Sequence, residues 1–397
     1  MVGGGAAGLS LAHRLARSGI SDLAVAEPLE GPLRPAERTW CHWAEGPGEF
    51  GAAVAASWER LRVRGPDGST VIIDPSPMTY RMIRSGAFEE LVHGALAGHP
   101  RARLVRGAVR EIRQSPGGAE VVCDLGDGGR LELHGRYVFD SRPLPALPPA
   151  RTVLLQHFRG WFVRTASARF DPEVADLMDF RVPQPRHGLA FGYVLPLAPD
   201  HALVEYTEFS RGPLTSAGYE AALRHYAERV LRLGPYTVVS AEQGVIPMTD
   251  ARFPRRVGPS SYRIGAAGGA TRPATGYTFS AVQRQSRDIT AALRAGRRDI
   301  VPPPYGRRAL AMDAVLLRAI DAGRIDGPAF FTHLFRTVPG ERLLRFLDGR
   351  TSPREEFGIG LRTPVAPMLR TAAELPFLRR RPCPGAIAAP RPEENPR

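Results

Sequence analysis

Apolar positions at the start of the chain predict a glycine-rich turn, a helix and then a short strand. The residues at helical spacing are Leu9, Leu11, Ala12, Leu15 and Ala16. Gly19 is a natural helix stop, and residues 23–26 form an apolar strand that ends at Glu27. A strand of about 5 residues normally precedes such a turn, but only Met1 and Val2 come before the glycines. We therefore expect that the start codon is misassigned or that the chain is truncated.

Alternating apolar and polar positions predict a mixture of strands and helices between residues 60 and 300. The strand-like runs are 61–64, 70–74, 120–124, 130–133, 137–140, 153–158, 188–196, 202–209 and 262–266. Helices are expected at 88–96, 219–233 and 280–295. The proline-rich stretch 143–149 is typical of a crossing between subdomains, and the region 151–250 that follows it is β-rich.

Beyond the prolines at 302–304, the pattern becomes helical. One apolar stripe consists of Phe330, Phe331, Leu334, Phe335 and Val338, and a second of Leu343, Leu344, Phe346 and Leu347. Core packing explains the first stripe, and so would contact with an apolar ligand or with lipid. Residues 379–397 have too few apolar positions to fold, so we expect a disordered tail there.

Composition excludes several classes of protein. Hydrophobic residues make up 43% and charged residues 23% of the 397 positions, which is ordinary for a soluble globular protein. The three cysteines are widely spaced and form neither a disulfide framework nor a zinc site, so a cytoplasmic location is expected. His42, His157 and His187 lack metal-ligand spacing, and no metal is predicted. No run approaches the roughly 18–20 apolar residues that cross a bilayer.

The chain is strongly basic, with a formal net charge of +13. All 53 basic residues are arginine, which with 42 Gly and 38 Pro indicates a GC-rich genome more than a functional demand. The basic surface is either simply solvated or attracted to an anionic membrane, on which the protein can lie without crossing it. Nucleic acid is not expected as a partner, because no reader motif and no aromatic–basic interleaving is present.

The N-terminal glycines have the spacing of a dinucleotide-binding turn. The candidate residues are Gly3, Gly5, Ala6 and Gly8. Such glycines let the backbone approach a pyrophosphate, and the N–H groups of the following helix face the phosphates. Glu27 lies 19 residues after Gly8, where a carboxylate can accept hydrogen bonds from ribose hydroxyls. FAD is favoured over NAD, because the motif is at the extreme N-terminus and a β-rich region follows.

A second glycine-rich segment covers residues 265–277. Its candidate cofactor contacts are Gly268, Gly269, Thr275 and Gly276. A turn of small residues before a helix allows close backbone approach to a flavin, although a tight strand–helix turn without a ligand would look the same.

The segment Val-Glu-Tyr-Thr-Glu-Phe-Ser at 204–210 places two glutamates in an apolar strand. Alternation puts Glu205 and Thr207 on one face, and Tyr206 and Glu208 on the other. If one glutamate is buried beside apolar groups, its raised pKa keeps it protonated and makes it a general acid. The alternative is that both are exposed or paired with arginines.

Several of these segments resemble the FAD-dependent lycopene β-cyclases, in the same order along the chain. The matching segments are RTWCHW at 38–43, YRMIRSGAF at 80–88, FDSR at 139–142, VEYTEFS at 204–210, GVIPM at 244–248, GGATRPATGYTF at 268–279 and FFTHLF…RLLRFLDG at 330–349. The resemblance extends to about residue 370, and the ordered combination is far more specific than the glycine motif alone.

The resemblance implies a reaction and a site. Members of the family convert lycopene to β-carotene by way of γ-carotene, with reduced FAD, NAD(P)H as reductant and no net redox change. Glu205 matches the proposed acid–base residue, and Arg38 joins the cofactor contacts. Tyr206 stands where the family has a second acidic residue, and Glu208 is the other candidate acid. The partners implied are a linear carotene, an anionic membrane surface and other carotenoid enzymes.

The implied fold class is α/β (mixed α+β), like that of the flavin monooxygenase superfamily. A Rossmann-like FAD domain would comprise residues 1–142 and 244–300. A β-sheet substrate domain would comprise 143–243, and C-terminal helices would occupy 301–378 before the tail at 379–397.

This chemistry requires an undissociated and well-aimed acid, because alkenes are very weak bases. Protonation of a terminal alkene gives a tertiary cation, which anionic reduced flavin or the aromatic residues Trp40, Trp43 and Tyr277 could stabilise. Core packing is the other explanation for each of these aromatics. The rival functions are an FAD-dependent monooxygenase, a prenyl-lipid reductase, and an inactive flavoprotein that binds carotenoid or membrane.

Overall fold

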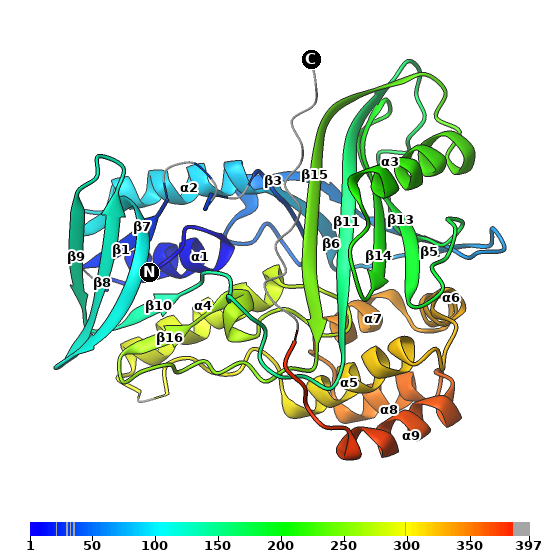
Figure 1. Ribbon diagram of the computed structural model, residues 1–397. Helices are drawn as coiled ribbons and strands as arrows, with labels where there is room; N and C mark the ends of the chain where they lie inside the picture. Colours follow the sequence, from blue (N-terminus) through cyan, green and yellow to red (C-terminus); the bar gives the residue numbers. More distant parts are fainter. Residues whose placement is uncertain (21, 29–30, 32, 35, 298, 384–397) are drawn as a thin grey trace.

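The computed structural model describes the chain except residues 21, 29–30, 32, 35, 298 and 384–397. Two sheet-based layers lie side by side, and a group of C-terminal helices packs against the second of them (Figure 1). The mixed α/β fold class is as predicted.

The first layer is a mixed sheet in which Val2 occupies the central position. On one side lie β1 (Leu23–Glu27), β7 (Ala102–Ser115), β8 (Gly118–Leu125) and β9 (Arg130–Gly135), in that order. On the other side lie β10 (Val138–Asp140) and β16 (Ser261–Arg263). Val2 forms parallel bridges to both Ala26 and Asp140. Val2 therefore joins the two groups of strands.

Three helices pack around this layer. They are α1 (Ala6–Arg17), α2 (Ser85–Ala97) and α4 (Phe279–Arg294). α1 packs on both α2 and α4, and its buried side chains share one apolar core with β1 and Phe88. All three helices were predicted from apolar periodicity, with bounds close to those observed.

The second layer is a seven-stranded sheet in the order β15-β11-β14-β13-β12-β4-β5. Its strands are β4 (Arg60–Arg64), β5 (Thr70–Ile73), β11 (Val153–Thr165), β12 (Val174–Asp179), β13 (Leu189–Ala198), β14 (His201–Ser210) and β15 (Tyr236–Thr249). The sheet takes in β4 and β5 from the segment assigned to the cofactor domain, and β15 crosses the expected boundary at 244. Local alternation could not show this, because β4 pairs with the distant β12.

A small sheet and two sets of helices cover the seven strands. β2 (Thr39–Ala44), β6 (Thr79–Arg84) and β3 (Val54–Trp58) form the small sheet, preceded by the turn η1 (Gly51–Ala53). α3 (Ser216–His225) and its π-helical extension η2 (Tyr226–Val230) pack against β11 and β14. The C-terminal helices are α5 (Arg307–Asp321), α6 (Gly327–Thr337), α7 (Gly340–Leu347), α8 (Pro353–Gly360) and α9 (Val365–Glu374), ending in η4 (Leu375–Phe377).

The apolar stripe of α6 lies in the hydrophobic core. Phe330, Phe331 and Leu334 are buried in the same cluster as Leu203 of β14, and α6 contacts β4, β5 and β13. Packing against the sheet therefore explains the stripe, and lipid does not cover it. In the described parts of the chain, no helix is both long and apolar enough to cross a membrane.

The segment after α9 is ordered as far as it is described. Arg381 pairs with Ala150 in both directions, its N–H at 2.8 Å and its carbonyl at 3.0 Å. The Arg380 guanidinium donates to the Asp250 carbonyl at 2.7 Å. The predicted disorder is therefore wrong for residues 379–383, because backbone pairing holds this polar segment. Residues 384–397 of the predicted tail lie outside the described residues.

A buried ion pair ties the second glycine-rich segment to the C-terminal helices. Arg272 is 1% exposed, and its Nε lies 2.7 Å from Asp313 Oδ2 in α5. The guanidinium carbon is 5.5 Å from the ring centre of Tyr305 and 5.8 Å from that of Phe346. The Arg272 N–H also donates to the Tyr277 carbonyl at 2.9 Å, which closes the loop.

We predict that Arg272→Ala lowers the free energy of unfolding by about 3–5 kcal/mol, because it leaves Asp313 buried and unpaired. The double variant Arg272→Met/Asp313→Leu should regain much of that loss. Urea unfolding measures both, with the exposed Arg307→Ala as control. Equal destabilisation of the single and double variants would contradict the prediction.

Candidate active site

The N-terminal turn leaves backbone donors facing open space. α1 begins at Ala6 after Gly5, and no side chain caps it. The first backbone bond of the helix runs from Leu9 N to Gly5 O, so the N–H groups before Leu9 have no helical partner. A Cβ on Gly8 would lie 2.0 Å from Gly3 O, whereas a Cβ on Gly5 would have nothing within 4 Å. The turn is therefore tight behind the helix and open in front of it.

Glu27 ends β1 beside this turn with half of its carboxylate unused. It is 1% exposed, and Oε1 is held by Arg106 and by His93 Nε2 at 3.2 Å. Oε2 is buried without a hydrogen-bond partner. A buried carboxylate oxygen normally has a donor, so a ligand hydroxyl fits here.

The second glycine-rich segment packs directly on the first. A Cβ on Gly265 would lie 2.6 Å from Ala7 Cβ, and a Cβ on Gly268 would lie 2.5 Å from Arg263 O. The turn η3 (Gly265–Gly268) is followed by Gly269 in the left-handed region, at φ 83°. The predicted contacts in the two segments are thus brought together.

The far end of this loop reaches the seven-stranded sheet. A Cβ on Gly276 would lie 2.0 Å from Gln156 Oε1 of β11, and Thr275 Oγ1 is buried without a partner. The structure gives less support to Arg38 as a cofactor contact. Its side chain is exposed, and its hydrogen bonds to Ser85 are made by its backbone, the N–H to Ser85 Oγ at 2.9 Å and the carbonyl from Ser85 N at 2.8 Å. The unpaired oxygens of Glu27 and Thr275 and the open turn at Gly5 fit a dinucleotide such as FAD.

β2 lies between the cofactor layer and the seven-stranded sheet, and its side chains point alternately to one and to the other. Trp40 and His42 point to the first layer, with ring centres 5.8 Å and 4.8 Å from that of Phe279. Trp43 points the other way, and its ring centre is 4.5 Å from that of Tyr277. Of the three aromatics considered for a cation, Trp43 and Tyr277 therefore lie together, and Trp40 packs in the cofactor-layer core.

Glu205 is buried on the sheet face towards β2. It is 7% exposed, and Thr207 Oγ1 donates to its Oε1 at 2.6 Å. Burial, followed by the charge of Glu242, raises the pKa of Glu205 to about 8, and the Thr207 bond lowers it slightly. No arginine or histidine pairs with Glu205 within the described ranges. The carboxyl group is therefore protonated at neutral pH.

Two tyrosines and a thiol line the same face. Tyr193 lies directly across from Glu205 in the β13–β14 register, and its hydroxyl is 2.8 Å from that of Tyr80. Burial raises the pKa of the Cys41 thiol to about 12, so it stays neutral between these hydroxyls and Glu205. The surroundings of Glu205 are thus polar but uncharged on this side.

A second carboxyl group lies on the other side of Glu205. Gly160 of β11 pairs with Glu205 on β14 and with Glu242 on β15. Residues directly opposite in a sheet share a face, so the two glutamates flank a position without a side chain. Thr39 Oγ1 donates to Glu242 Oε2 at 2.6 Å.

Glu208 lies on the opposite face, as strand alternation predicted. Tyr206 donates to its Oε2 at 3.2 Å, and His157 Nε2 lies 3.9 Å from its Oε1. His157 also contacts Tyr219 of α3 at 2.8 Å, and burial lowers the pKa of His157 to about 4. The structure does not bring Glu208 together with Glu205.

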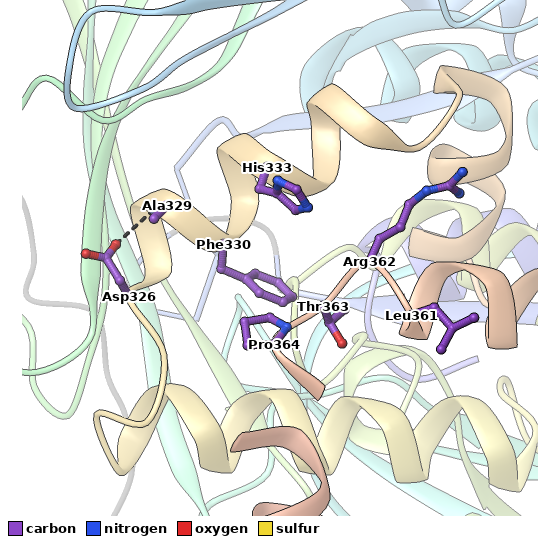
Figure 2. Close-up of a pocket in the computed structure, with 8 residues that line it drawn as sticks. All are labelled: Asp326, Ala329, Phe330, His333, Leu361, Arg362, Thr363 and Pro364. Atoms are coloured by element: carbon purple, nitrogen blue, oxygen red, sulfur yellow. Dashed lines mark hydrogen bonds between the residues drawn. The ribbon is translucent and has the colours of Figure 1, made fainter. Parts of the chain in front are cut away.

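A surface pocket of about 340 Å³ opens beside α6 (Figure 2). Phe330 and His333 project from α6 towards Thr363 and Pro364 in the α8–α9 connection. Phe330, which lines the pocket, also belongs to the apolar cluster that holds Leu203 on the Glu205 side of the sheet.

Comparison with known proteins decides the family. The family described as lycopene cyclase protein matches residues 1–373. The chain belongs to the lycopene cyclase family. No curated protein matches the chain by sequence.

Solved structures show the fold of the chain. A flavoprotein/dehydrogenase from Cytophaga hutchinsonii aligns with a TM-score of 0.65 and 12% identity, covering 94% of this chain and 98% of that one. p-Nitrophenol 4-monooxygenase PnpA from Pseudomonas putida DLL-E4 aligns with a TM-score of 0.63 and 15% identity, covering 88% and 98%. A geranylgeranyl bacteriochlorophyll reductase-like protein from Thermoplasma acidophilum aligns with a TM-score of 0.56 and 13% identity, covering 95% and 98%. The fold is a Rossmann-like flavoprotein fold.

Sequence reasoning missed several residues of this candidate site. They are Thr39, Cys41, Tyr80, Tyr193, Gly160 and Glu242. Glu242 lies just before the GVIPM segment and Cys41 inside RTWCHW, so both were near recognised motifs. Their approach to Glu205 depends on the register of β11, β14 and β15, which no local pattern reveals.

The raised pKa of Glu205 predicts a pH-dependent stability. The folded protein keeps this proton from the usual pKa of 4.5 up to about 8, whereas the unfolded chain releases it. Stability from this group is therefore full below pH 4.5 and is lost as pH rises towards 8, by up to about 1.4 kcal/mol per pH unit. Glu205→Gln should remove this slope, as measured by urea unfolding at pH 5 and pH 7.5. Identical slopes in the two proteins would count against a protonated Glu205.

Proposed function

We propose that this protein is a lycopene β-cyclase. It converts lycopene by way of γ-carotene to β-carotene, with no net redox change, in carotenoid biosynthesis. The observation that carries the proposal is the carboxyl group of Glu205, which is buried, unpaired with any cation in the described chain and protonated at neutral pH. An alkene is protonated only by an undissociated acid held in a dry site.

Glu205 serves as both acid and base. Its carboxyl group gives a proton to the terminal double bond of the carotene, and the neighbouring double bond attacks the tertiary cation and closes the ring. The resulting carboxylate then removes a proton from the ring carbon next to the cation, which restores the acid. The Thr207 hydroxyl donates to Oε1 at 2.6 Å, so it fixes the orientation of the Glu205 carboxyl group during both proton transfers.

Aromatic faces near Glu205 suit a transient cation. Trp43 and Tyr277 meet edge to face at 4.5 Å, and the ring centre of Trp43 is 6.2 Å from that of Tyr80. The electron-rich faces of such rings attract a cation, and desolvation strengthens the attraction. Their bulk also excludes water, which would otherwise add to the cation.

The two glycine-rich segments would hold FAD, with NAD(P)H as the reductant. The backbone donors at Gly5, Ala6 and Gly8 would face the pyrophosphate, and Glu27 the ribose. Gly268, Gly269, Thr275 and Gly276 would approach the flavin end. When bound and reduced, the flavin would supply negative charge that stabilises a cation.

The C-terminal helices suit a carotene that arrives from a membrane. Five of the large apolar side chains that are most exposed in the described chain lie on α8, α9 and their flanks: Phe357, Leu361, Val365, Leu369 and Phe377. Exposed arginines follow the same helices, at 354, 362 and 370. An apolar surface bordered by cations suits an anionic bilayer, and the pocket beside Phe330 lies next to it. These features support our proposal of a peripheral, cytoplasmic association with the membrane.

Pigment analysis of lycopene-accumulating cells tests the proposed reaction. Cells that express the wild-type chain should form γ- and β-carotene, and Glu205→Gln should reduce conversion at least 100-fold, because an amide is no proton donor. Glu208→Gln should retain conversion, since Glu208 faces α3. Unchanged lycopene in the presence of flavin-loaded wild-type protein would contradict the cyclase. An oxygenated or hydrogenated product would support the monooxygenase or the reductase instead.

Vesicle sedimentation tests the membrane surface. Leu361→Ser/Leu369→Ser should weaken binding to phosphatidylglycerol vesicles at least several-fold, because both side chains are more than half exposed and contribute apolar burial only on a bilayer. Val238→Ser/Val239→Ser, exposed on β15, is the matched control. Equal binding by wild type and both double variants would rule this surface out.

A further inference from the structure

A second carboxyl group, that of Glu242, lies on the same face of the sheet as Glu205. We propose that Glu242 is the ionised member of a carboxyl pair with Glu205, and that as a positioning residue it keeps Glu205 in the acid form in which it protonates the carotene. This inference rests on the proposed cyclase function and adds a residue to its site.

The sheet places the two groups across one strand. Glu205, Gly160 and Glu242 occupy successive strands in one register row, so their side chains rise from the same face. Neighbouring strands are about 4.8 Å apart, so the two glutamate Cα atoms are about 10 Å apart and their side chains can lean towards each other. A Cβ on Gly160 would lie 3.4 Å from Glu205 Cβ and 2.8 Å from Leu203 Cδ1. Gly160 itself therefore adds no side chain between the two glutamates, and the side chain of Leu203 lies beside that position.

The two carboxyl groups have different surroundings. Those of Glu242 favour its ionised form, and those of Glu205 favour its protonated form. Glu242 is half-buried and receives the Thr39 hydroxyl bond at 2.6 Å, and the Arg84 cation on β6 also favours its anion. Arg84 also pairs with Glu37, whose charge acts in the opposite direction and raises the pKa of Glu242. The guanidinium carbon of Arg84 is 4.3 Å from the Phe162 ring centre. Among the described residues no such cation pairs with Glu205, and the polar groups around it are Tyr193, Cys41, Thr207 and Glu242.

Electrostatic repulsion then determines which of the two carboxyl groups keeps its proton. Two carboxyl groups at close range resist ionising together, and the one without a cation keeps its proton to a higher pH. Burial raises the pKa of both groups, and the charge of Glu242 adds to the rise at Glu205. Removal of that charge should therefore make Glu205 lose its proton at lower pH, without removing any group that touches the substrate.

The pH profile of Glu242→Gln tests the pair. The rate of lycopene cyclisation is measured from pH 5.5 to 9.5, with flavin-reduced enzyme and carotene-loaded vesicles. The alkaline fall in rate should move down by about one pH unit, so the rate at pH 8 drops several-fold to about tenfold relative to wild type. At pH 6 the variant should keep the wild-type rate, because Glu205 is protonated in both. Glu208→Gln, a buried carboxyl group on the other face, should keep the wild-type profile.

Two results would overturn the pair: an unshifted alkaline fall, and a loss of rate by the same factor at every pH, which indicates a structural role only. If Glu242→Gln does not accumulate, Glu242→Asp and Glu242→Asn, which match in size, are compared instead, and only Asn should shift the fall. An active wild type with unshifted variants overturns this inference alone. A wild type that forms no cyclic carotene at any pH overturns the proposed function and the pair with it.

Discussion

A carboxyl group buried in a sheet without a cationic partner constrains everything around it. Glu205 is 7% exposed, and its only hydrogen-bond donor among the described side chains is Thr207. Such a group is stable only while it holds a proton, and it holds that proton only while water is kept out. The small sheet β2-β6-β3 and the C-terminal helices provide this exclusion, because they cover the face on which Glu205 lies. The C-terminal helices thus have a chemical role as well as a packing one.

Strand alternation connects the cofactor layer to this face. β2 sends Trp40 and His42 into the core around α4, and sends Thr39, Cys41 and Trp43 towards the seven-stranded sheet. The second glycine-rich loop makes the other connection, since Gly276 lies against Gln156 on β11. A flavin held by the two glycine-rich segments would therefore border the carboxyl site through a single strand and a single loop. Few residues separate the two, so changes at either should be felt at the other.

Local pattern predicted the parts of this site that local structure determines. Alternation alone assigned Glu205 and Thr207 to one face and Glu208 to the other, and helical spacing located α1, α2 and α4. It could not find Glu242 or Gly160, since their roles arise only when β11 and β15 pair in register. Only Met1 and Val2 precede the glycines, and pairing in space, which the sequence does not reveal, lets Val2 bridge both Ala26 and Asp140. The sequence pattern did not predict the order of residues 379–383 for a similar reason. Backbone pairing with Ala150 holds this segment, which lacks apolar side chains.

The central claim is that Glu205 starts the reaction by giving a proton to carbon, with nothing oxidised or reduced. Turnover of unlabelled lycopene in D₂O, with mass analysis of the product and a parallel assay of NAD(P)H, tests it most directly. The carboxyl proton exchanges with solvent between turnovers, so the account predicts one deuterium for each ring formed and no NAD(P)H consumed in proportion to product. A product that has gained two hydrogens or an oxygen atom, with matching consumption of NAD(P)H, would contradict it.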